Sequence, residues 1–200
     1  DSLNMVTASF GLMGFDNKSE MNSANTMKGG FYGEGFSYKS FSDQDNDSYS
    51  INGSVDYQHT FANNKERMLT LSYLISITPN YTDAYSLFET NGQESLFNMT
   101  NRYTDGYRNT LENTFQADFS TPLAAGHKLN VGAKYILRNN KSDSKYYLDD
   151  NGQYVYNEAG SLNYKHQNDI LAGYVEYDGK WGKWGLKGGV RYEHTWQNVK

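Results

Sequence analysis

The sequence has 200 residues, with 18 Lys and Arg against 23 Asp and Glu, which gives a formal net charge of −5. This balance is too acidic for a protein that binds a phosphate backbone, so nucleic acid is not an expected partner. The absence of cysteine excludes disulfides, thiol catalysis and cysteine-ligated metals. No run reaches the roughly 18 apolar residues of a membrane-spanning helix. Aromatic residues make up 16% of the chain, which together with the small net charge argues against disorder of the whole sequence.

Alternation of apolar and polar residues predicts the secondary structure. From Tyr49 to Phe61 most odd positions are aromatic or apolar and the even positions are polar, and this period of two is typical of a strand. Pro79 is expected to end a later strand, because proline cannot donate to a sheet ladder. Asn151-Gly152 is a strong turn signal. The strands expected in chain order are 4–15, 30–41, 49–61, 69–77, 114–120, 129–138, 170–177 and 186–196.

The connections between these strands alternate in length. Segments 62–66, 121–128 and 179–184 are short, whereas 80–108 and 139–167 are long and polar. Outer-membrane barrels have short periplasmic turns and longer external loops, and their strands need roughly 9–11 residues to cross the bilayer. We therefore expect an all-β fold, an antiparallel up-and-down meander of about eight strands that forms part of a transmembrane β-barrel.

A soluble antiparallel sheet with one face on a core and one in water would show the same alternation. The barrel is favoured because the long loops fall on one side and because the apolar faces end in aromatic residues. Trp181 and Trp184 lie in a short turn with Tyr177 just before them, which fits an interfacial girdle. The alternative is a soluble, surface-exposed or secreted module that binds carbohydrate through tyrosine-rich loops.

Several strings in the second half of the chain carry a family resemblance. They are Gln116–Leu123 (QADFSTPL), Leu129–Asn139 (LNVGAKYILRN), Ala172–Tyr177 (AGYVEY) and Gly189–Glu193 (GVRYE). Together they resemble the outer-membrane β-barrel family of TonB-dependent receptors of the Bacteroidetes type. The similarity is clearest over about residues 110–196.

The resemblance implies a receptor of about twenty-two strands that is plugged by an N-terminal domain and imports a scarce nutrient with energy delivered by TonB. We expect residues 1–200 to be a single segment of such a barrel domain, with the plug domain and the remaining strands absent. The partners implied are outer-membrane lipid, TonB and the plug through the full-length receptor, and the imported nutrient. The expected location is the outer membrane.

The tyrosine-rich segment 139–167 provides the candidate ligand residues. Aromatic faces beside hydrogen-bonding amides suit a sugar or another amphipathic solute, although external loops are also tyrosine-rich when they only pack on one another. The candidates are Tyr146, Tyr147, Tyr154, Tyr156 and Tyr164.

Other motifs carry weaker signals. The four histidines lack metal-ligand spacing and no Gly-x-Ser-x-Gly motif occurs, so we expect neither an enzyme nor a cofactor. Asp43, Asp45 and Asp47 alternate like the start of a calcium loop, but the required Gly and Glu are replaced by serines, which favours a solvated hairpin tip. Lys187, Arg191 and Glu193 share a strand face, where we expect cross-strand ion pairs or contacts with a lumen or plug.

Overall fold

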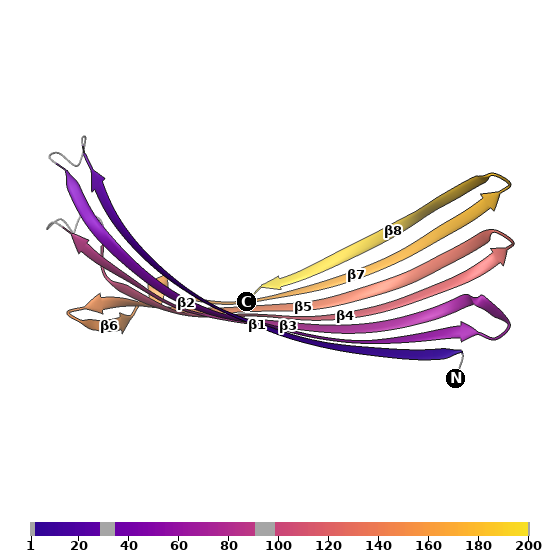
Figure 1. Ribbon diagram of the computed structural model, residues 1–200, viewed down its shortest axis with the longest axis horizontal. Coiled ribbons are helices and arrows are strands. Elements are labelled where there is room, and N and C mark those ends of the chain that lie inside the picture. The colour runs from indigo at the N-terminus through magenta and orange to yellow at the C-terminus, as the bar shows by residue number, and fades with distance from the viewer. Residues whose placement is uncertain (1–2, 29–34, 91–98, 200) are drawn as a thin grey trace.

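The computed structural model describes residues 3–28, 35–90 and 99–199. These residues form one antiparallel sheet, in which each long strand pairs with the next along the chain (Figure 1). The strand order is β1-β2-β3-β4-β5-β7-β8, and the short β6 folds back on β5. The strands are β1 (Asn4–Met27), β2 (Phe36–Phe61), β3 (Asn64–Thr90), β4 (Arg102–Ala124), β5 (His127–Asp150), β6 (Gln153–Tyr156), β7 (Leu162–Trp181) and β8 (Trp184–Val199), with a single 3-10 turn, η3 (Glu158–Gly160), between β6 and β7. The predicted all-β meander is confirmed.

The sheet is strongly curved, and its hairpins differ at its two ends (Figure 1). Tight turns at Ala62-Asn63, Gly126 and Gly182 join the strands at one end, which we call the short-turn end. Gly126 and Gly182 have φ angles of 77° and 59°, which glycine adopts without strain. At the other end, the long-hairpin end, Asn151 and Gly152 turn β5 into β6 with positive φ at both residues, as the sequence predicts.

The strands are much longer than the sequence predicts. Segments 80–108 and 139–167, expected as long polar loops, belong largely to strands: β3 continues to Thr90, β4 begins at Arg102, and β5 continues to Asp150. The expected strands 30–41 and 49–61 are parts of the single strand β2, although Gly30 to Glu34 lie outside the described residues. These predictions were wrong because polar residues lie on both faces of the strand extensions. The extensions therefore lack a clear apolar–polar alternation, although their cross-strand pairing continues.

Pro79 does not end β3. It lies inside the strand and pairs with Asn109 of β4. On its other side the β2–β3 ladder is interrupted opposite this point, between Ser48↔Asn80 and Ile51↔Ile77. The missing N–H of Pro79 therefore interrupts the β2–β3 ladder locally, and β3 continues as a strand because the residues on either side of the gap stay paired.

Within the described residues the sheet does not close. β1 and β8 are the two ends of the strand order and do not pair with each other. Only two hydrophobic residues of the described chain are buried, Phe36 and Ala172, so the sheet has almost no internal core. The apolar side chains must find their environment outside this sheet.

Candidate functional site

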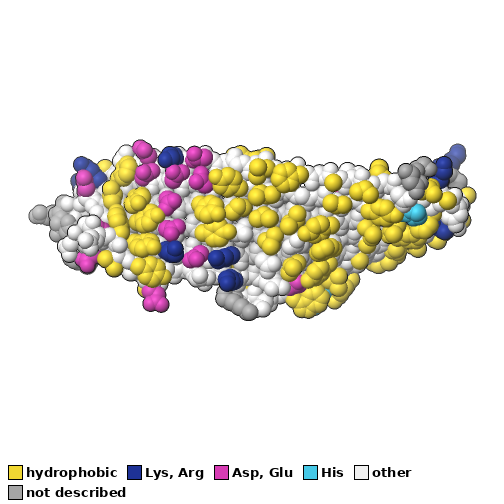
Figure 2. Space-filling view, turned by 90° about the horizontal axis from the view of Figure 1, so that it is seen from below, with side chains coloured by type: hydrophobic (Ala, Val, Ile, Leu, Met, Phe, Trp, Pro, Cys, Tyr) yellow, Lys and Arg dark blue, Asp and Glu magenta, His cyan; other side chains and the backbone are white. Residues whose placement is uncertain are grey.

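The strand register divides the side chains between two faces. Residues paired across strands point to the same side, and residues two apart along a strand do so as well. On one side, which we call the outward face, apolar residues form a continuous band over all seven long strands (Figure 2). One row of this band consists of Ala8, Val55, Tyr73, Phe115, Tyr135, Leu171 and His194.

The apolar band approaches the height of about 25 Å that the apolar band of a transmembrane barrel has. On β3 it runs from Leu69 to Ile77, about 27 Å along the strand at about 3.4 Å per residue, or about 21 Å along the membrane normal at a tilt of about 40°. Its members are exposed in the isolated sheet, with 75% of Phe10 and 76% of Val190 accessible. An exposed apolar surface of this extent requires a nonpolar environment.

Aromatic residues border the band. At the short-turn end, His127 lies 5.0 Å from the Trp181 ring and its Nδ1 is 2.6 Å from the Tyr177 hydroxyl. Beyond the opposite border, Tyr81 and Tyr107 pack with ring centroids 5.1 Å apart. This arrangement is the double aromatic girdle of transmembrane barrels and agrees with the predicted interfacial role of Trp181.

Polar groups inside the band have partners. The Tyr73 hydroxyl donates to Asn113 Oδ1 over 2.8 Å, and the Tyr135 hydroxyl donates to Asp169. An unpaired amide or carboxyl would be costly in lipid, so these tyrosines reduce the cost of keeping Asn113 and Asp169 on the outward face.

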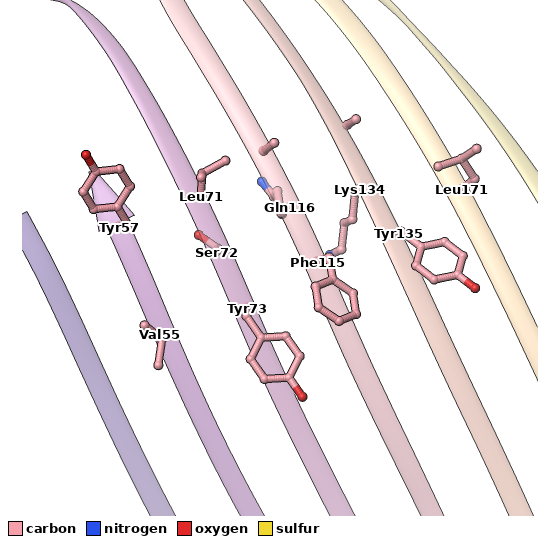
Figure 3. Close-up of a pocket in the computed structure, with 12 residues that line it drawn as sticks. Val55, Tyr57, Leu71, Ser72, Tyr73, Phe115, Gln116, Lys134, Tyr135 and Leu171 are labelled. Carbon is pink, nitrogen blue, oxygen red and sulfur yellow. The ribbon is translucent and has the colours of Figure 1, made fainter. Parts of the chain in front are cut away.

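Small residues open a shallow hollow in the middle of the band (Figure 3). Ala117 and Ala133 are cross-strand partners, and the larger side chains of Tyr73, Phe115 and Leu171 surround them. The hollow has a volume of about 520 Å³ and an almost wholly apolar lining. Its place on the lipid-facing band suits an acyl chain better than a water-soluble ligand.

The opposite, inward face is polar and carries a hydrogen-bonded network. Arg138 on β5 donates to Glu112 on β4 through both Nε and an Nη atom at 2.7 Å. Lys187 on β8 pairs across the strands with Glu176 at 3.0 Å, as predicted, whereas Arg191 pairs within its own strand with Glu193 at 2.8 Å. A polar inward face opposite an apolar outward face is the pattern of a barrel with an aqueous or plugged lumen.

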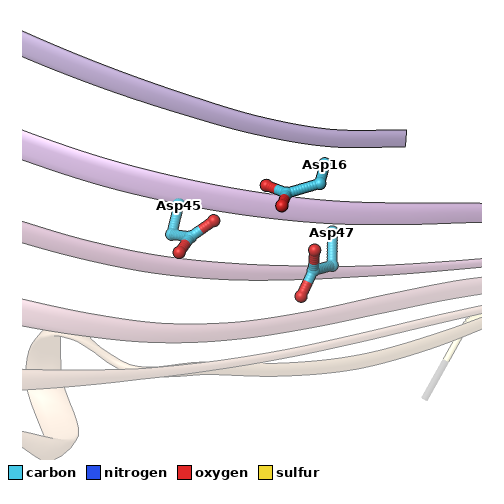
Figure 4. Close-up of side chains that lie close together, drawn as sticks. All are labelled: Asp16, Asp45 and Asp47. Carbon is cyan, nitrogen blue, oxygen red and sulfur yellow. The ribbon is translucent and has the colours of Figure 1, made fainter. Parts of the chain in front are cut away.

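A charged belt lies on the outward face beyond the band, toward the long-hairpin end (Figure 2). Carboxylate oxygens of Asp16, Asp45 and Asp47 lie within 4.8 Å of one another (Figure 4), and Lys18 Nζ is 2.9 Å from Asp45. Hydrogen bonding to Asp45 raises the pKa of Lys18. Three such carboxylates have the chemistry to hold a hard cation, but they are side chains of two paired strands. Both the calcium-loop hypothesis and the hairpin-tip interpretation of Asp43, Asp45 and Asp47 are therefore wrong, because these residues lie inside β2.

Farther along the outward face, tyrosines form a ladder across β3, β4, β5 and β6. The rings of Tyr85 and Tyr103 stack with centroids 4.5 Å apart, and the Tyr147 ring lies 5.5 Å from that of Tyr103. Tyr154 and Tyr156 complete the ladder at 5.9 Å from Tyr85 and 5.7 Å from Tyr147. The Tyr103 hydroxyl donates to Asp83 over 2.5 Å, and this bond to a carboxylate raises the Tyr103 pKa.

The five candidate ligand tyrosines therefore do not form one site. Tyr147, Tyr154 and Tyr156 belong to the outward ladder, whereas Tyr146 and Tyr164 point to the inward face. All five lie in strands and not in an irregular loop. Tyr85 and Tyr103 were not predicted from the sequence, because 80–108 was expected to be a loop. The alternation Tyr81, Asp83, Tyr85, Leu87 was the available signal.

A sheet with an apolar outward band, aromatic borders and a polar inward face is the wall of a transmembrane β-barrel. Residues 59–200 match the model of the outer membrane protein beta-barrel family, and the chain belongs to this family. Its location is the outer membrane, which argues against the soluble-module alternative. No helix among the described residues is long and apolar enough to span a membrane.

Among solved structures, the chain is similar to the ferric citrate transporter FecA in its unliganded form, with 14% sequence identity and a TM-score of 0.41. The match covers 98% of this chain and 39% of that transporter chain. The chain thus spans about two fifths of the length of the protein it matches. A comparison with curated proteins found no match.

Proposed function

We propose that this chain forms part of the barrel wall of a TonB-dependent outer-membrane receptor that imports a scarce nutrient. The observation that carries the proposal is the open, two-faced sheet. Its apolar band faces outward, its polar network faces inward, and β1 and β8 each have one edge that no strand of the described residues pairs with. Open strand edges are not tolerated in lipid, so further strands must pair with both edges and enclose a lumen wider than seven strands allow.

The lengths of the strands indicate how the sheet is oriented across the membrane. They continue well beyond the apolar band at the long-hairpin end only, and in bacterial barrels that end faces the exterior. The inward face of this extension would form the ligand vestibule. Tyr146 and Tyr164 are the two sequence candidates on that face, and the Tyr164 ring lies 6.0 Å from that of His166.

In this proposal the chain performs no covalent chemistry. Ligand capture occurs on the inward face of the vestibule, and TonB-driven rearrangement of a plug opens the path to the periplasm. Both the plug and the TonB contact would be supplied by parts of the receptor outside these 200 residues.

Uptake by cells tests the proposal. The full receptor that carries this chain is deleted, and cells are screened for the nutrient whose accumulation falls. Restoring the receptor should restore uptake, and deleting TonB should abolish it again. Tyr146→Ala with Tyr164→Ala should weaken uptake, whereas Tyr147→Ala with Tyr156→Ala, on the outward ladder, should leave it unchanged. Uptake that does not depend on TonB would refute the proposal.

A further inference from the structure

Two lysines on the outward face lie directly opposite each other, and Asp143, two residues from Lys141 on the same face, forms an ion pair with neither of them. Lys141 of β5 and Lys165 of β7 are cross-strand partners, and both are exposed. Like charges in such a pair destabilise a sheet. Neither ammonium lies within ion-pair distance of a carboxylate of the described residues. Lys141 Nζ instead lies 5.5 Å from the centre of the Tyr107 ring. The pair is complementary to an anion from outside the sheet.

The position of the pair relative to the apolar band identifies the kind of anion. Asn139, two residues before Lys141 on the same face, pairs with Leu111, which belongs to the last row of the band together with Ile77. One two-residue step along a tilted strand is about 5 Å along the membrane normal. The two ammonium groups therefore lie beyond the apolar band, on the headgroup side toward the long hairpins.

A hollow at this level supplies further polar groups. Its volume is about 340 Å³, and its outward-facing lining includes Asn109, Leu111, Asn139 and Gln167 beside the two lysines. With Asn198, the cross-strand partner of Gln167, the hollow has four outward amides next to two cations, which suit a ligand that carries both hydroxyl groups and a negative charge. Leu111 connects the hollow to the apolar band, so a ligand held here can continue into the hydrocarbon layer.

We propose that Lys141 and Lys165 bind a phosphate on the saccharide headgroup of an outer-leaflet glycolipid. The amides of the hollow bind sugar hydroxyls, and the acyl chains lie along the apolar band. Charge complementarity and continuity with the lipid-facing band select this occupant over a soluble ligand. The proposal rests on the outer-membrane location and the assignment of faces, and not on nutrient import.

The test measures lipid binding by the full protein that carries this chain. The protein is purified in detergent and titrated with an acylated diglucosamine phosphate lipid, with bound lipid counted by native mass spectrometry. Lys141→Gln with Lys165→Gln should weaken binding about twenty-five-fold, since each basic residue near a charged lipid surface contributes about fivefold. The dephosphorylated lipid should bind the wild type and this variant equally.

Lys145→Gln is the matched control. Lys145 lies on the same strand and face as Lys141, but its ammonium pairs with Asp105 at 3.6 Å, so its loss should leave lipid binding unchanged. Lys141→Arg with Lys165→Arg should retain binding, and a shift of migration on boiling verifies that each variant folds. Equal binding by the wild type and the double glutamine variant would overturn the proposal. An equal loss in Lys145→Gln, or displacement of the lipid by inorganic phosphate alone, would also overturn it.

Discussion

Replacing Leu171 with arginine places a charge in the middle of the outward apolar band. Leu171 lies in the row with Phe115, which is midway between Phe119 and Leu111 on β4, and 46% of Leu171 is accessible in the isolated sheet. Arginine at the midplane of a lipid-facing strand costs about 2–4 kcal/mol, and the cost falls to about 0–1 kcal/mol near the interfaces. We therefore expect Leu171→Arg to lower the free energy of unfolding by about 3 kcal/mol.

Two matched arginine substitutions test separately how the destabilisation depends on depth in the membrane and on the face of the sheet. Leu186 lies on the outward face near the short-turn end, so Leu186→Arg should cost less than about 1 kcal/mol. Thr195 is exposed and lies next to His194, the neighbour of Leu171 in the band, but on the inward face. Thr195→Arg should change the free energy of unfolding by about 0.5 kcal/mol or less.

The assay is reversible unfolding in lipid vesicles, followed by tryptophan fluorescence as guanidinium is increased, on the full protein that carries this chain. The faces assigned here would be reversed if Thr195→Arg cost more than Leu171→Arg. Equal costs for Leu171→Arg and Leu186→Arg would refute the placement of the band across the bilayer.

Three further predictions concern single contacts. In an alkaline absorbance titration the Tyr103 phenol should ionise at a higher pH than an ordinary tyrosine, because its hydroxyl donates a hydrogen bond to the Asp83 carboxylate. The stability that this hydrogen bond provides is fully present below about pH 10 and is lost as the pH rises through the raised pKa of Tyr103. Asp83→Asn should return the Tyr103 ionisation to the ordinary range, and an unchanged titration would contradict the assigned bond. A double-mutant cycle on Glu112 and Arg138 should give a coupling free energy of about 1 kcal/mol, because both side chains are partly exposed and solvent weakens their ion pair. A coupling of zero would show that this ion pair does not stabilise the sheet. Gly152 has a φ of 88° and nothing lies within 4 Å of a Cβ added there, so Gly152→Ala should lower the free energy of unfolding by about 1 kcal/mol through backbone strain alone. Gly185 is equally open but has no positive φ, so Gly185→Ala should lower it by less. Guanidinium unfolding measures both.

The sequence predicts the membrane-embedded half of this sheet well. On β3 and β5 one face must contact lipid, so Leu69 to Ile77 and Leu129 to Leu137 keep the apolar alternation that identifies a strand. The tight turns at Gly126 and Gly182 follow from the short connections between such strands.

In the strand extensions beyond the membrane neither face contacts lipid, so the alternation of apolar and polar residues that identifies a strand is lost. Residues such as Thr82, Asp83 and Ala84 form strand only because β2 and β4 continue to pair on either side of them. Tyr146 and Tyr147 point to opposite faces because they are consecutive in a strand, which could not be predicted while 139–167 was assigned to a loop. The three-carboxylate cluster likewise needs the β1–β2 register, because Asp16 lies about thirty residues from Asp45 in the sequence.

The most direct test of the account is a single-cysteine scan of β7 in lipid vesicles. The chain has no cysteine of its own, so a spin label can be placed at each position from 170 to 177 in turn. We expect a period of two: labels at Leu171, Gly173, Val175 and Tyr177 should be accessible to oxygen dissolved in the bilayer, and labels at the intervening positions should not. Uniform exposure to a water-soluble relaxation agent, without alternation, would contradict the claim that this sheet is the wall of a membrane barrel.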